Sequence, residues 1–421
     1  MSSKPALPPP LEGVKVIELS HLIAGPYCGQ LLAEEGATVI KVEPPEGELT
    51  RHREPMRHSP QGTISGYFGA LNRGKKSVAI DLKNPEGLQL LHGLLESADV
   101  VVTNMRGGAL KRLGLYPDDL LARYPRLIVA CISGFGLKNA GAFTERAGLA
   151  MVAEALSGTT GLTRDHDGNP VWCGFAMGDI LAGMSAHAAI LLALRNQQRH
   201  GQGRVLDLSM VECTMPMVCV ALAREQSASQ ELRAFAGSNN FHGVPYGAFP
   251  ASDGHVNLGV NRDDFWKRLC EAMGRPELGS DPRYERYVER AKRQQEVHQI
   301  TEAFTRAHTR AEIVDKLNAV DVPVASILGM ADIVSDEYLQ GRGSLRTVHD
   351  GIGGTMQLPV DPTRFEAAPG SDLVPLLGQH RDEVLAAELG LAAQDIARLE
   401  SAGAFGTRGQ DRQNRRESAL H

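Results

Sequence analysis

The first half of the chain alternates short apolar runs with helical patterns, and this alternation restricts the fold more than any other feature. Five runs have the length and residue types of strands: Val14–Leu19, Thr38–Glu43, Ser77–Asp81, Val100–Asn104 and Leu127–Ser133. Helical patterns begin at Gly25-Pro26 and at Pro85, between these runs. Because strand–helix–strand order is typical of parallel sheets covered by helices, the sequence predicts an α/β fold with a parallel sheet.

The pattern changes after residue 226. Before it, the sequence predicts a long helix, a strand and another helix: Ile180–Gln198, Gly203–Ser209 and Met210–Gln226. The polar segment Ser227–Tyr246 then suggests a crossing between domains, and Ala248–Val260 predicts a hairpin around Ser252-Asp253-Gly254. Residues 263–320 are mostly helical and charged, so we expect a second, smaller α+β unit. After Pro323 the short elements suggest a return to the first domain.

Length and composition exclude several classes of protein. A chain of 421 residues is long enough for two domains, and a net charge of -6 does not suggest a nucleic-acid-binding protein. The six cysteines form no C-x-x-C pair, which argues against a zinc site. The proline-rich Met1–Pro10 lacks the apolar core of a signal peptide, and the runs Ala188–Leu194 and Met215–Ala223 are too short to span a bilayer. We therefore expect a soluble cytoplasmic protein without membrane or nucleic-acid partners.

Glycine and basic motifs suggest an anion site at one edge of the sheet. The turn Ala24-Gly25-Pro26 follows the first strand, and free N–H groups at a helix start bind anions; a plain strand-to-helix turn is the alternative. Basic clusters at 73–76 and 104–112 adjoin predicted strands, although each could be a solvated surface. The glycines from Gly134 to Gly141 have the wrong spacing for a dinucleotide site, so no nicotinamide is expected.

One acidic residue stands at the start of the long predicted helix. Asp179 is preceded by Gly178 and followed by Gly183, so a ligand or another backbone could approach it closely. An aspartate at this place is also a good helix N-cap, which is the structural alternative.

Taken in order, these segments resemble the class III CoA-transferase family, which includes formyl-CoA and carnitine CoA-transferases and the α-methylacyl-CoA racemases. The resemblance extends over almost the whole chain. The matching segments are Leu11–Leu19, Ala24–Pro26, Gly36–Glu43, Asn72–Ser77, Ile80–Leu82, Asn104, Gly114-Leu115, Ser133–Gly136, Ala155–Gly158, Pro245–Phe249, Asp253-Gly254, Pro323 and Leu377-Gly378.

The resemblance implies an architecture and a set of site residues. Asp179 falls on the family's nucleophile. The family's CoA contacts fall on His21, Leu22, Ala24, Lys75, Asn104 and Arg112, with Arg73 and Arg106 as neighbours. Family members are interlocked, ring-like homodimers. On that pattern we expect a large Rossmann-like domain from residues 1–226 and 326–405, a linker with a small α+β domain at 227–325, and a disordered tail at 406–421.

The resemblance also implies a chemistry in which an acyl-CoA donor and a carboxylic acid acceptor exchange CoA. A carboxylate attacks the donor thioester to form a mixed anhydride, and the CoA thiolate then gives an aspartyl-CoA thioester. An aspartate at its ordinary pKa of about 3.9 is ionised at neutral pH, so neither a metal nor ATP is required. Backbone N–H groups near Gly237, Ser238 and Asn239 are candidates for stabilising the oxyanion.

Leu149 and Ala150 separate the possible activities. Racemases of the family carry a catalytic His-Asp pair at these positions, and neither side chain here can move a proton. We therefore predict a CoA-transferase. A racemase or epimerase is the second hypothesis, and a CoA-binding protein without catalysis is the third.

Overall fold

The computed structural model describes residues 7–165, 168–227, 243–363 and 370–406. The chain forms two compact units, and each is considered separately. The first unit contains residues 1–156, 176–214 and 338–421, and the second contains residues 157–175 and 215–337.

The first unit is built on a six-stranded sheet in which every pair of neighbours is parallel. Its strands are β1 (Lys15–Leu19), β2 (Thr38–Glu43), β5 (Lys76–Ala79), β6 (Val100–Thr103), β7 (Ile128–Ser133) and β8 (Arg204–Ser209). Their spatial order is β5-β2-β1-β6-β7-β8, which confirms the predicted α/β fold with a parallel sheet. The order reverses between β1 and β6, and such a reversal opens a crevice at the carboxyl ends of the strands.

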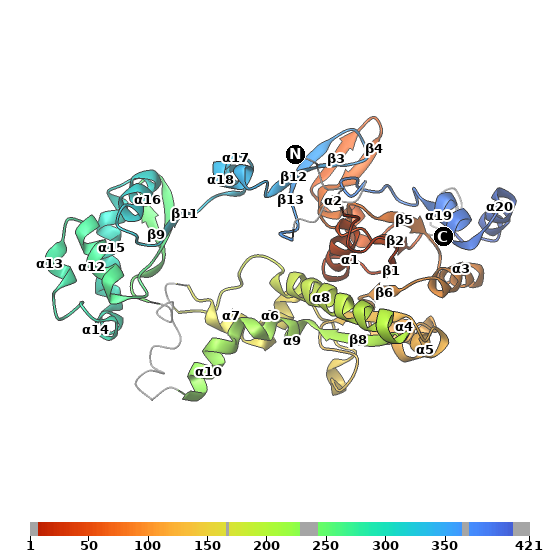
Figure 1. Cartoon of the computed structure of the whole chain (residues 1–421), viewed down its shortest axis with the longest axis horizontal. Helices are drawn as coiled ribbons and strands as arrows, with labels where there is room; N and C mark the ends of the chain where they lie inside the picture. Colours follow the sequence, from red (N-terminus) through yellow and green to blue (C-terminus); the bar gives the residue numbers. More distant parts are fainter. Residues whose placement is uncertain (1–6, 166–167, 228–242, 364–369, 407–421) are drawn as a thin grey trace, which may run out of the picture. The chain divides into compact units, whose positions relative to one another are not determined.

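Helices cover both faces of this sheet (Figure 1). One face packs against α1 (Ala24–Glu34) and α8 (Met177–His200). The other face packs against α3 (Pro85–Glu96), α4 (Gly107–Arg112), α5 (Pro117–Arg123), α19 (Arg381–Leu389) and α20 (Ala393–Ser401). Alternate strand residues face opposite sides, so Val16 and Ile17 of β1 belong to different apolar cores. Because both faces are covered, the strands are mostly apolar, and the charged Glu18 and Lys41 within them are buried as an ion pair.

Helices α1 and α8 approach closely because small residues face each other. A Cβ atom at Gly183 would lie 2.8 Å from the Ala24 carbonyl oxygen, too close for any side chain. Ala182 and Ala186 complete this buried stripe. By length and composition alone α8 could cross a bilayer, but here it packs along α1, β7 and β8 as a core helix does. The close crossing places the first turn of α8 beside the first turn of α1.

Two hairpins and several short helices complete the first unit. Strands β3 (Met56–Ser59) and β4 (Gly62–Ser65) form one hairpin, and β12 (Leu345–His349) and β13 (Thr355–Pro359) form the other. They enclose a small core around Phe68 of α2 (Gly66–Asn72). The remaining short helices are η1 (Leu49–His52), η2 (Gly141–Phe143), α6 (Ala150–Ser157) and α9 (Met210–Thr214). The sequence did not predict the first hairpin, because residues 56–65 lack an alternating apolar pattern.

The second unit has a three-stranded antiparallel sheet in the order β11 (Val324–Ser326), β10 (Gly254–Gly259), β9 (Tyr246–Ala251). Gly254 pairs with Ala251, which confirms the hairpin predicted around residues 252–254. Its helices are α7 (Thr159–Leu162), η3 (Met215–Val218), α10 (Cys219–Ser227), α12 (Asp263–Ala272), α13 (Pro276–Gly279), α14 (Tyr287–Lys292), α15 (Gln294–Arg306), α16 (Arg310–Asn318) and α17 (Met330–Ser335). α18 (Glu337–Gly341) spans the limit between the two units. The buried Trp266 lies in the core of the second unit.

Two expectations about chain organisation differ from the structure. The single helix predicted over 210–226 is wrong: it divides into α9, η3 and α10, because Pro216 has no N–H to donate within a helix. The units also divide at other places than residues 226 and 325, since α7 packs with η3 and brings residues 157–175 into the second unit. Residues 407–421, which include nearly all of the predicted tail, lie outside the described residues.

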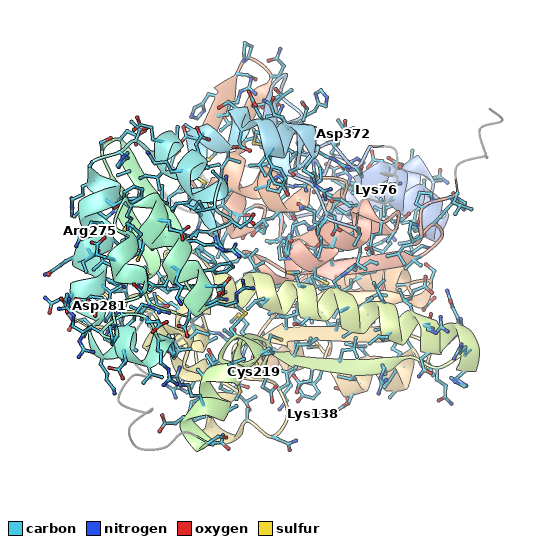
Figure 2. The ribbon with its side chains drawn as sticks, turned by 60° about the vertical axis from the view of Figure 1, so that its left-hand side comes forward. Lys76, Lys138, Cys219, Arg275, Asp281 and Asp372 are labelled. Carbon is cyan, nitrogen blue, oxygen red and sulfur yellow. The ribbon has the colours of Figure 1, made fainter. Side chains whose placement is uncertain are left out.

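Charged side chains are concentrated on the surfaces of both units, as Figure 2 shows for Lys76 and Lys138 in the first and Arg275 and Asp281 in the second. Most of these form exposed ion pairs, which contribute little to stability.

Candidate active site

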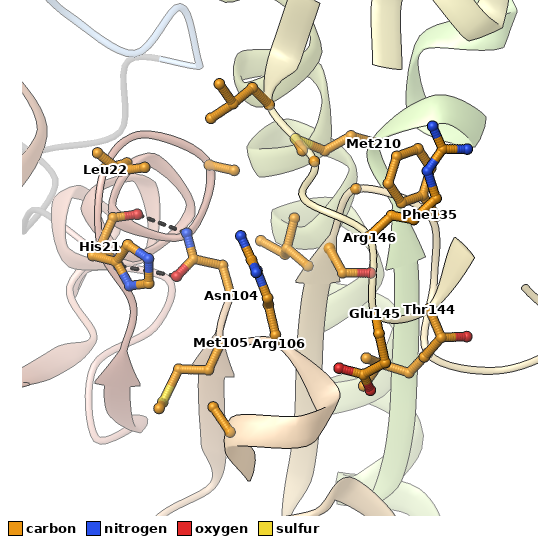
Figure 3. Close-up of a pocket in the computed structure, with 18 of the residues that line it drawn as sticks. His21, Leu22, Asn104, Met105, Arg106, Phe135, Thr144, Glu145, Arg146 and Met210 are labelled. Atoms are coloured by element: carbon orange, nitrogen blue, oxygen red, sulfur yellow. Dashed lines mark hydrogen bonds between the residues drawn. The ribbon is translucent and has the colours of Figure 1, made fainter. Parts of the chain in front are cut away.

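A cavity of about 560 Å³ lies at the carboxyl ends of β1, β6, β7 and β8 in the first unit (Figure 3). This is the crevice at which the strand order reverses. Seven of the nine predicted site residues line it: His21, Leu22, Ala24, Asn104, Arg106, Arg112 and Asp179. They come from segments as far apart as β1 and α8, so only the sheet topology brings them together.

Asp179 is half-buried in the first turn of α8 and faces this cavity. It is not the N-cap of the helix, since Ala176 has that position. A backbone hydrogen bond links its carboxylate to Ala24 at the start of α1. Burial raises the pKa of Asp179 to about 6, the Ala24 hydrogen bond lowers it, and the charge of Glu154 raises it. This corrects the expectation of an ordinary pKa, although a group with pKa about 6 is still about nine-tenths ionised at pH 7.

The turn between β1 and α1 has a conformation that the sequence did not reveal. Leu22 has a φ of 66°, a left-handed conformation that a leucine adopts only under constraint. Its N–H donates to Glu48 over 3.3 Å. Gly25 has no room for a side chain, because a Cβ atom there would lie 2.3 Å from that of Ser20. At this helix start, a backbone hydrogen bond from Ala24 is used within the chain, by the Asp179 carboxylate.

Asn104 holds the same turn from the neighbouring strand. Its Oδ1 accepts from the His21 N–H over 3.0 Å, and its Nδ2 donates to the His21 carbonyl oxygen over 2.6 Å (Figure 3). Both polar atoms of the amide are thus used to join the ends of β1 and β6. Burial lowers the pKa of the His21 ring, which favours the neutral form beside the cavity.

Comparison with known proteins decides the family. The model of CoA-transferase family III matches residues 11–381. This chain belongs to CoA-transferase family III. A succinyl-CoA–D-citramalate CoA-transferase of Chloroflexus aurantiacus is 36% identical over 94% of this chain and 98% of its own. A succinate–glutarate CoA-transferase of Agrobacterium fabrum is 32% identical over 92% of this chain and 97% of its own. The crystal structure of a CAIB/BAIF family protein from Brucella suis superposes with a TM-score of 0.78 at 30% identity, covering 90% of this chain and 99% of that one. The protein is a class III CoA-transferase acting on carboxylic acids, as predicted.

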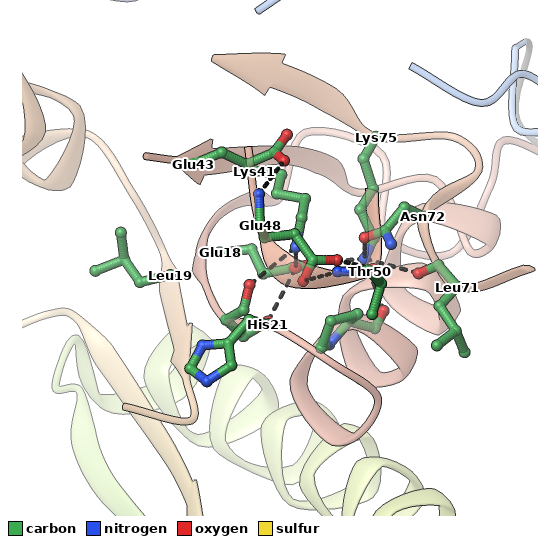
Figure 4. Close-up of polar contacts among 12 residues, drawn as sticks. Glu18, Leu19, His21, Lys41, Glu43, Glu48, Thr50, Leu71, Asn72 and Lys75 are labelled. Atoms are coloured by element: carbon green, nitrogen blue, oxygen red, sulfur yellow. Dashed lines mark hydrogen bonds and ion pairs between the residues drawn. The ribbon is translucent and has the colours of Figure 1, made fainter. Parts of the chain in front are cut away.

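Lys75 of the transferase does not line the cavity, contrary to its prediction as a CoA contact. Its side chain is 0% exposed and its Nζ forms an ion pair of 2.8 Å with Glu18, while Lys41 bonds the same carboxylate over 2.7 Å (Figure 4). Lys75 Nζ also donates to the carbonyl oxygens of Pro26 and Leu71, over 2.7 and 3.0 Å. Burial lowers the pKa of Lys75 to about 8, and Glu18 opposes that shift. Lys75 therefore stabilises the start of α1 through Pro26 rather than contacting the cavity.

Arg73 is likewise absent from the cavity lining. It is buried, forms an ion pair with Glu34 of α1, and donates to the Pro359 carbonyl oxygen over 2.8 Å. Its guanidinium joins α1 to the hairpin of β12 and β13, which is a structural role.

Three exposed arginines supply positive charge to the cavity of the transferase: Arg106, Arg112 and Arg146. Within the described residues, no ion pair joins any of them to a carboxylate of the chain. The Arg146 guanidinium lies over the Phe143 ring at 4.5 Å and the Phe135 ring at 5.8 Å, so aromatic contacts orient it. The charges of all three are available to a ligand.

A second cavity of about 430 Å³ adjoins the first and shares His21, Leu49 and Met105 with it. It lies at the carboxyl ends of β1, β2 and β5, and Lys83 lines it. The sequence did not predict this lysine as a site residue, because it lies outside the basic clusters at 73–76 and 104–112. Its place just after a predicted strand was the available signal.

Tyr67 and Glu154 were also missed. Burial and the Asp179 charge both raise the pKa of the Tyr67 hydroxyl on α2. Glu154 of α6 accepts a hydrogen bond from the Gly178 N–H over 2.9 Å. Neither lies next to Asp179 in the sequence, so no local motif could have revealed them.

Two further predictions concern the backbone groups that stabilise the oxyanion and the need for a metal ion. The oxyanion candidates Gly237, Ser238 and Asn239 lie outside the described residues. Among the residues that the structure does describe, no three His, Cys, Asp or Glu side chains are grouped closely enough to hold a metal ion.

The raised pKa of Asp179 has a measurable effect on stability. The folded-state pKa of about 6 lies above the ordinary 3.8, so this group's stabilising contribution is complete below pH 3.8 and is lost as the pH rises through 6. We expect Asp179→Asn to raise the free energy of unfolding by about 1–3 kcal/mol at pH 7.5. Urea denaturation at pH 7.5 and pH 4 measures this difference, which should be several times smaller at the lower pH. An equally large gain at both pH values would contradict the electrostatic origin.

Proposed function

We propose that the transferase moves CoA between two carboxylic acids by covalent catalysis at Asp179. The observation that carries the proposal is a half-buried carboxylate facing a cavity with three arginines that no carboxylate of the described chain neutralises. An Asp179 oxygen bonds to the acyl carbon of the donor thioester, the C–S bond breaks, and CoA leaves as a thiolate. The thiolate then attacks the Asp179 carbonyl carbon, and the donor acid leaves as a carboxylate. The acceptor carboxylate repeats these steps in reverse.

The two adjoining cavities supply the binding site for CoA. CoA is long and polyanionic, and Arg106, Arg112 and Lys83 place positive charge along the combined lining. Arginine and lysine are the side chains that bind phosphates best. The shared residues His21, Leu49 and Met105 form the passage between the cavities.

The acids are proposed to be dicarboxylic. The relatives named above act on succinate, glutarate or citramalate by their names, and further relatives are named for mesaconate and L-malate. Arg146 offers an anchor for the second carboxylate, because it lines the same cavity as Asp179 and is oriented by two phenylalanine rings. Leu149, which also lines the cavity, fits the methylene chain between the two carboxylates.

Arg146→Gln tests this assignment. Loss of a charge-assisted hydrogen bond costs about 1.5–3 kcal/mol, so KM for succinyl-CoA should rise about 10- to 150-fold. KM for butyryl-CoA, which has no second carboxylate, should change less than about threefold. Steady-state kinetics with both donors gives the comparison. Arg123→Gln is the matched control. The Arg123 guanidinium lies 5.3 Å from the centre of the Tyr124 ring, and Arg123 does not line the cavity. Equal losses with both donors would place Arg146 on CoA rather than on the acid.

The transferase is further proposed to be a cytoplasmic homodimer. Large apolar side chains are exposed on the first unit, among them Leu149, Met151, Met184 and Leu192 of α6, α8 and the loop before them. Monomeric proteins rarely expose many such groups on neighbouring elements. Light scattering coupled to gel filtration should give twice the mass of 45.4 kDa, and a monomer mass would contradict the assembly.

An exchange assay tests the activity itself. Succinyl-CoA is incubated with a panel of ¹³C-labelled acids, and new acyl-CoA species are identified by mass. Transfer predicts equimolar appearance of the labelled acyl-CoA and free succinate. Solvent deuterium at the α-carbon without exchange would instead indicate a racemase.

A further inference from the structure

A second carboxylate is hydrogen-bonded to the helix turn that carries the proposed nucleophile. Glu154 is on α6, is 1% exposed, and its Oε1 accepts the Gly178 N–H over 2.9 Å. Gly178 immediately precedes Asp179 in the first turn of α8. Because the N-cap Ala176 has no side chain that can cap the helix, Glu154 satisfies one of the N–H groups that a helix start leaves free.

The position of Glu154 is fixed by tight packing around Gly178. A Cβ atom at Gly178 would lie 3.3 Å from the Ala150 carbonyl oxygen and 3.5 Å from Thr214 Oγ1. Thr214 is itself held by a 2.6 Å hydrogen bond to the Met210 carbonyl oxygen. Helices α6, α8 and α9 therefore meet at this glycine, whose N–H the Glu154 carboxylate accepts.

The groups that interact with the Asp179 carboxylate come from three elements. Ala24 of α1 contributes a backbone hydrogen bond and Glu154 of α6 contributes a like charge, while the Asp179 charge in turn raises the pKa of Tyr67 of α2. The same cavity is also lined by the titratable and charged groups His21, Arg106, Arg112, Glu145 and Arg146. Of these groups, Glu154 is the buried acid joined directly to the turn that carries Asp179.

We propose that Glu154 is a positioning residue that holds the first turn of α8 and, by charge repulsion, favours the acylated forms of Asp179 over its free carboxylate. This inference rests on the proposed covalent mechanism and deepens it. The repulsion acts only while Asp179 is an anion.

The charge balance of the reaction explains the effect. When an Asp179 oxygen bonds to the acyl carbon, the negative charge leaves on the CoA thiolate. When the thiolate sulfur then bonds to the Asp179 carbonyl carbon, the charge leaves on the donor acid. Asp179 is uncharged in both the anhydride and the thioester, as it is when protonated. The Glu154 carboxylate therefore favours acylation and protonation by the same free energy.

This equivalence makes a quantitative prediction for Glu154→Gln, which keeps an oxygen to accept the Gly178 N–H and removes the charge. Burial is the larger cause of the raised pKa of Asp179, so Glu154 accounts for only part of it. We expect the acid limb of the kcat/KM profile to move down by about 0.5–1 pH unit. The ratio of aspartyl-CoA enzyme to free enzyme at fixed concentrations of acyl-CoA and free acid should fall about 3- to 10-fold, since one unit is a factor of ten.

The two quantities are measured on the full-length protein. Initial rates between pH 4.5 and 8.5 give the limb, and intact-protein mass after acid quench gives the covalent ratio at pH 7.5. Glu212→Gln, an exposed acid on α9, is the matched control and should leave both unchanged. Glu154→Asp keeps the charge and should retain the wild-type limb within about 0.3 unit.

The outcomes separate the inference from the proposed function. Wild-type protein that forms no covalent adduct at Asp179 overturns both. The inference alone is overturned if the wild-type protein forms the adduct but Glu154→Gln leaves the acid limb and the covalent ratio unchanged. A Glu154→Gln variant that differs from the wild type only by a lower Tm also overturns it. If Glu154→Gln does not fold, the Glu154→Asp variant decides. An acid limb of its kcat/KM profile that moves down by 0.5 pH unit or more overturns the role of the charge. An unchanged acid limb together with an unchanged covalent ratio supports it.

Discussion

Asp179→Asn is expected to lower kcat for CoA transfer by more than about 10⁴-fold, since loss of a covalent nucleophile removes the whole reaction path. The amide has the same shape and can keep the hydrogen bond from Ala24, but it cannot form an anhydride. The exchange assay measures the loss. In the wild type, acyl-CoA followed by hydroxylamine should leave a hydroxamate on the peptide that contains Asp179.

The matched control is Asp119→Asn. Asp119 is also an acid in the first turn of a helix, α5, but it is exposed and does not line the cavity. Its variant should retain wild-type kcat and KM. An Asp179→Ala protein with full transfer activity would exclude Asp179 as the nucleophile, because alanine offers no oxygen at all.

Lys75→Met is expected to lower the free energy of unfolding by about 3 kcal/mol or more, as removal of one partner from a buried ion pair does. Glu18 would keep Lys41 but lose its 2.8 Å contact with Lys75, and the Pro26 carbonyl oxygen would lose its donor. Urea denaturation at pH 7 measures the change. In the folded enzyme, KM for acyl-CoA should remain within about threefold of the wild type, because the lysine does not line the cavity.

Lys76→Met provides the control for this prediction. The neighbouring lysine is 38% exposed and pairs with Glu383 at the surface over 2.6 Å (Figure 2), so its loss should cost less than about 1 kcal/mol. A stable Lys75→Met protein with a strongly raised KM would instead support direct contact between Lys75 and CoA.

The tertiary structure places two residues that no local motif identifies. Glu154 of α6 accepts the N–H of Gly178 next to Asp179, and Lys83 after β5 lines the second cavity. A similar effect explains why Lys75 and Lys76 differ. They are neighbours in sequence, but successive residues point to opposite sides, so one meets the buried Glu18 and the other the solvent.

By itself the sequence determined the parallel α/β fold, the strands of the parallel sheet to within a few residues, the family, and the candidate nucleophile, because these depend on local apolar pattern and on ordered motifs. It also identified seven residues that line one cavity. Only the tertiary structure decided the rest. It placed Lys75 and Arg73 in buried ion pairs and used both amide atoms of Asn104 to hold His21. It raised the pKa of Asp179 to about 6. Burial and charge pairing depend on neighbours that are distant in the chain, and a sequence pattern does not contain those distances.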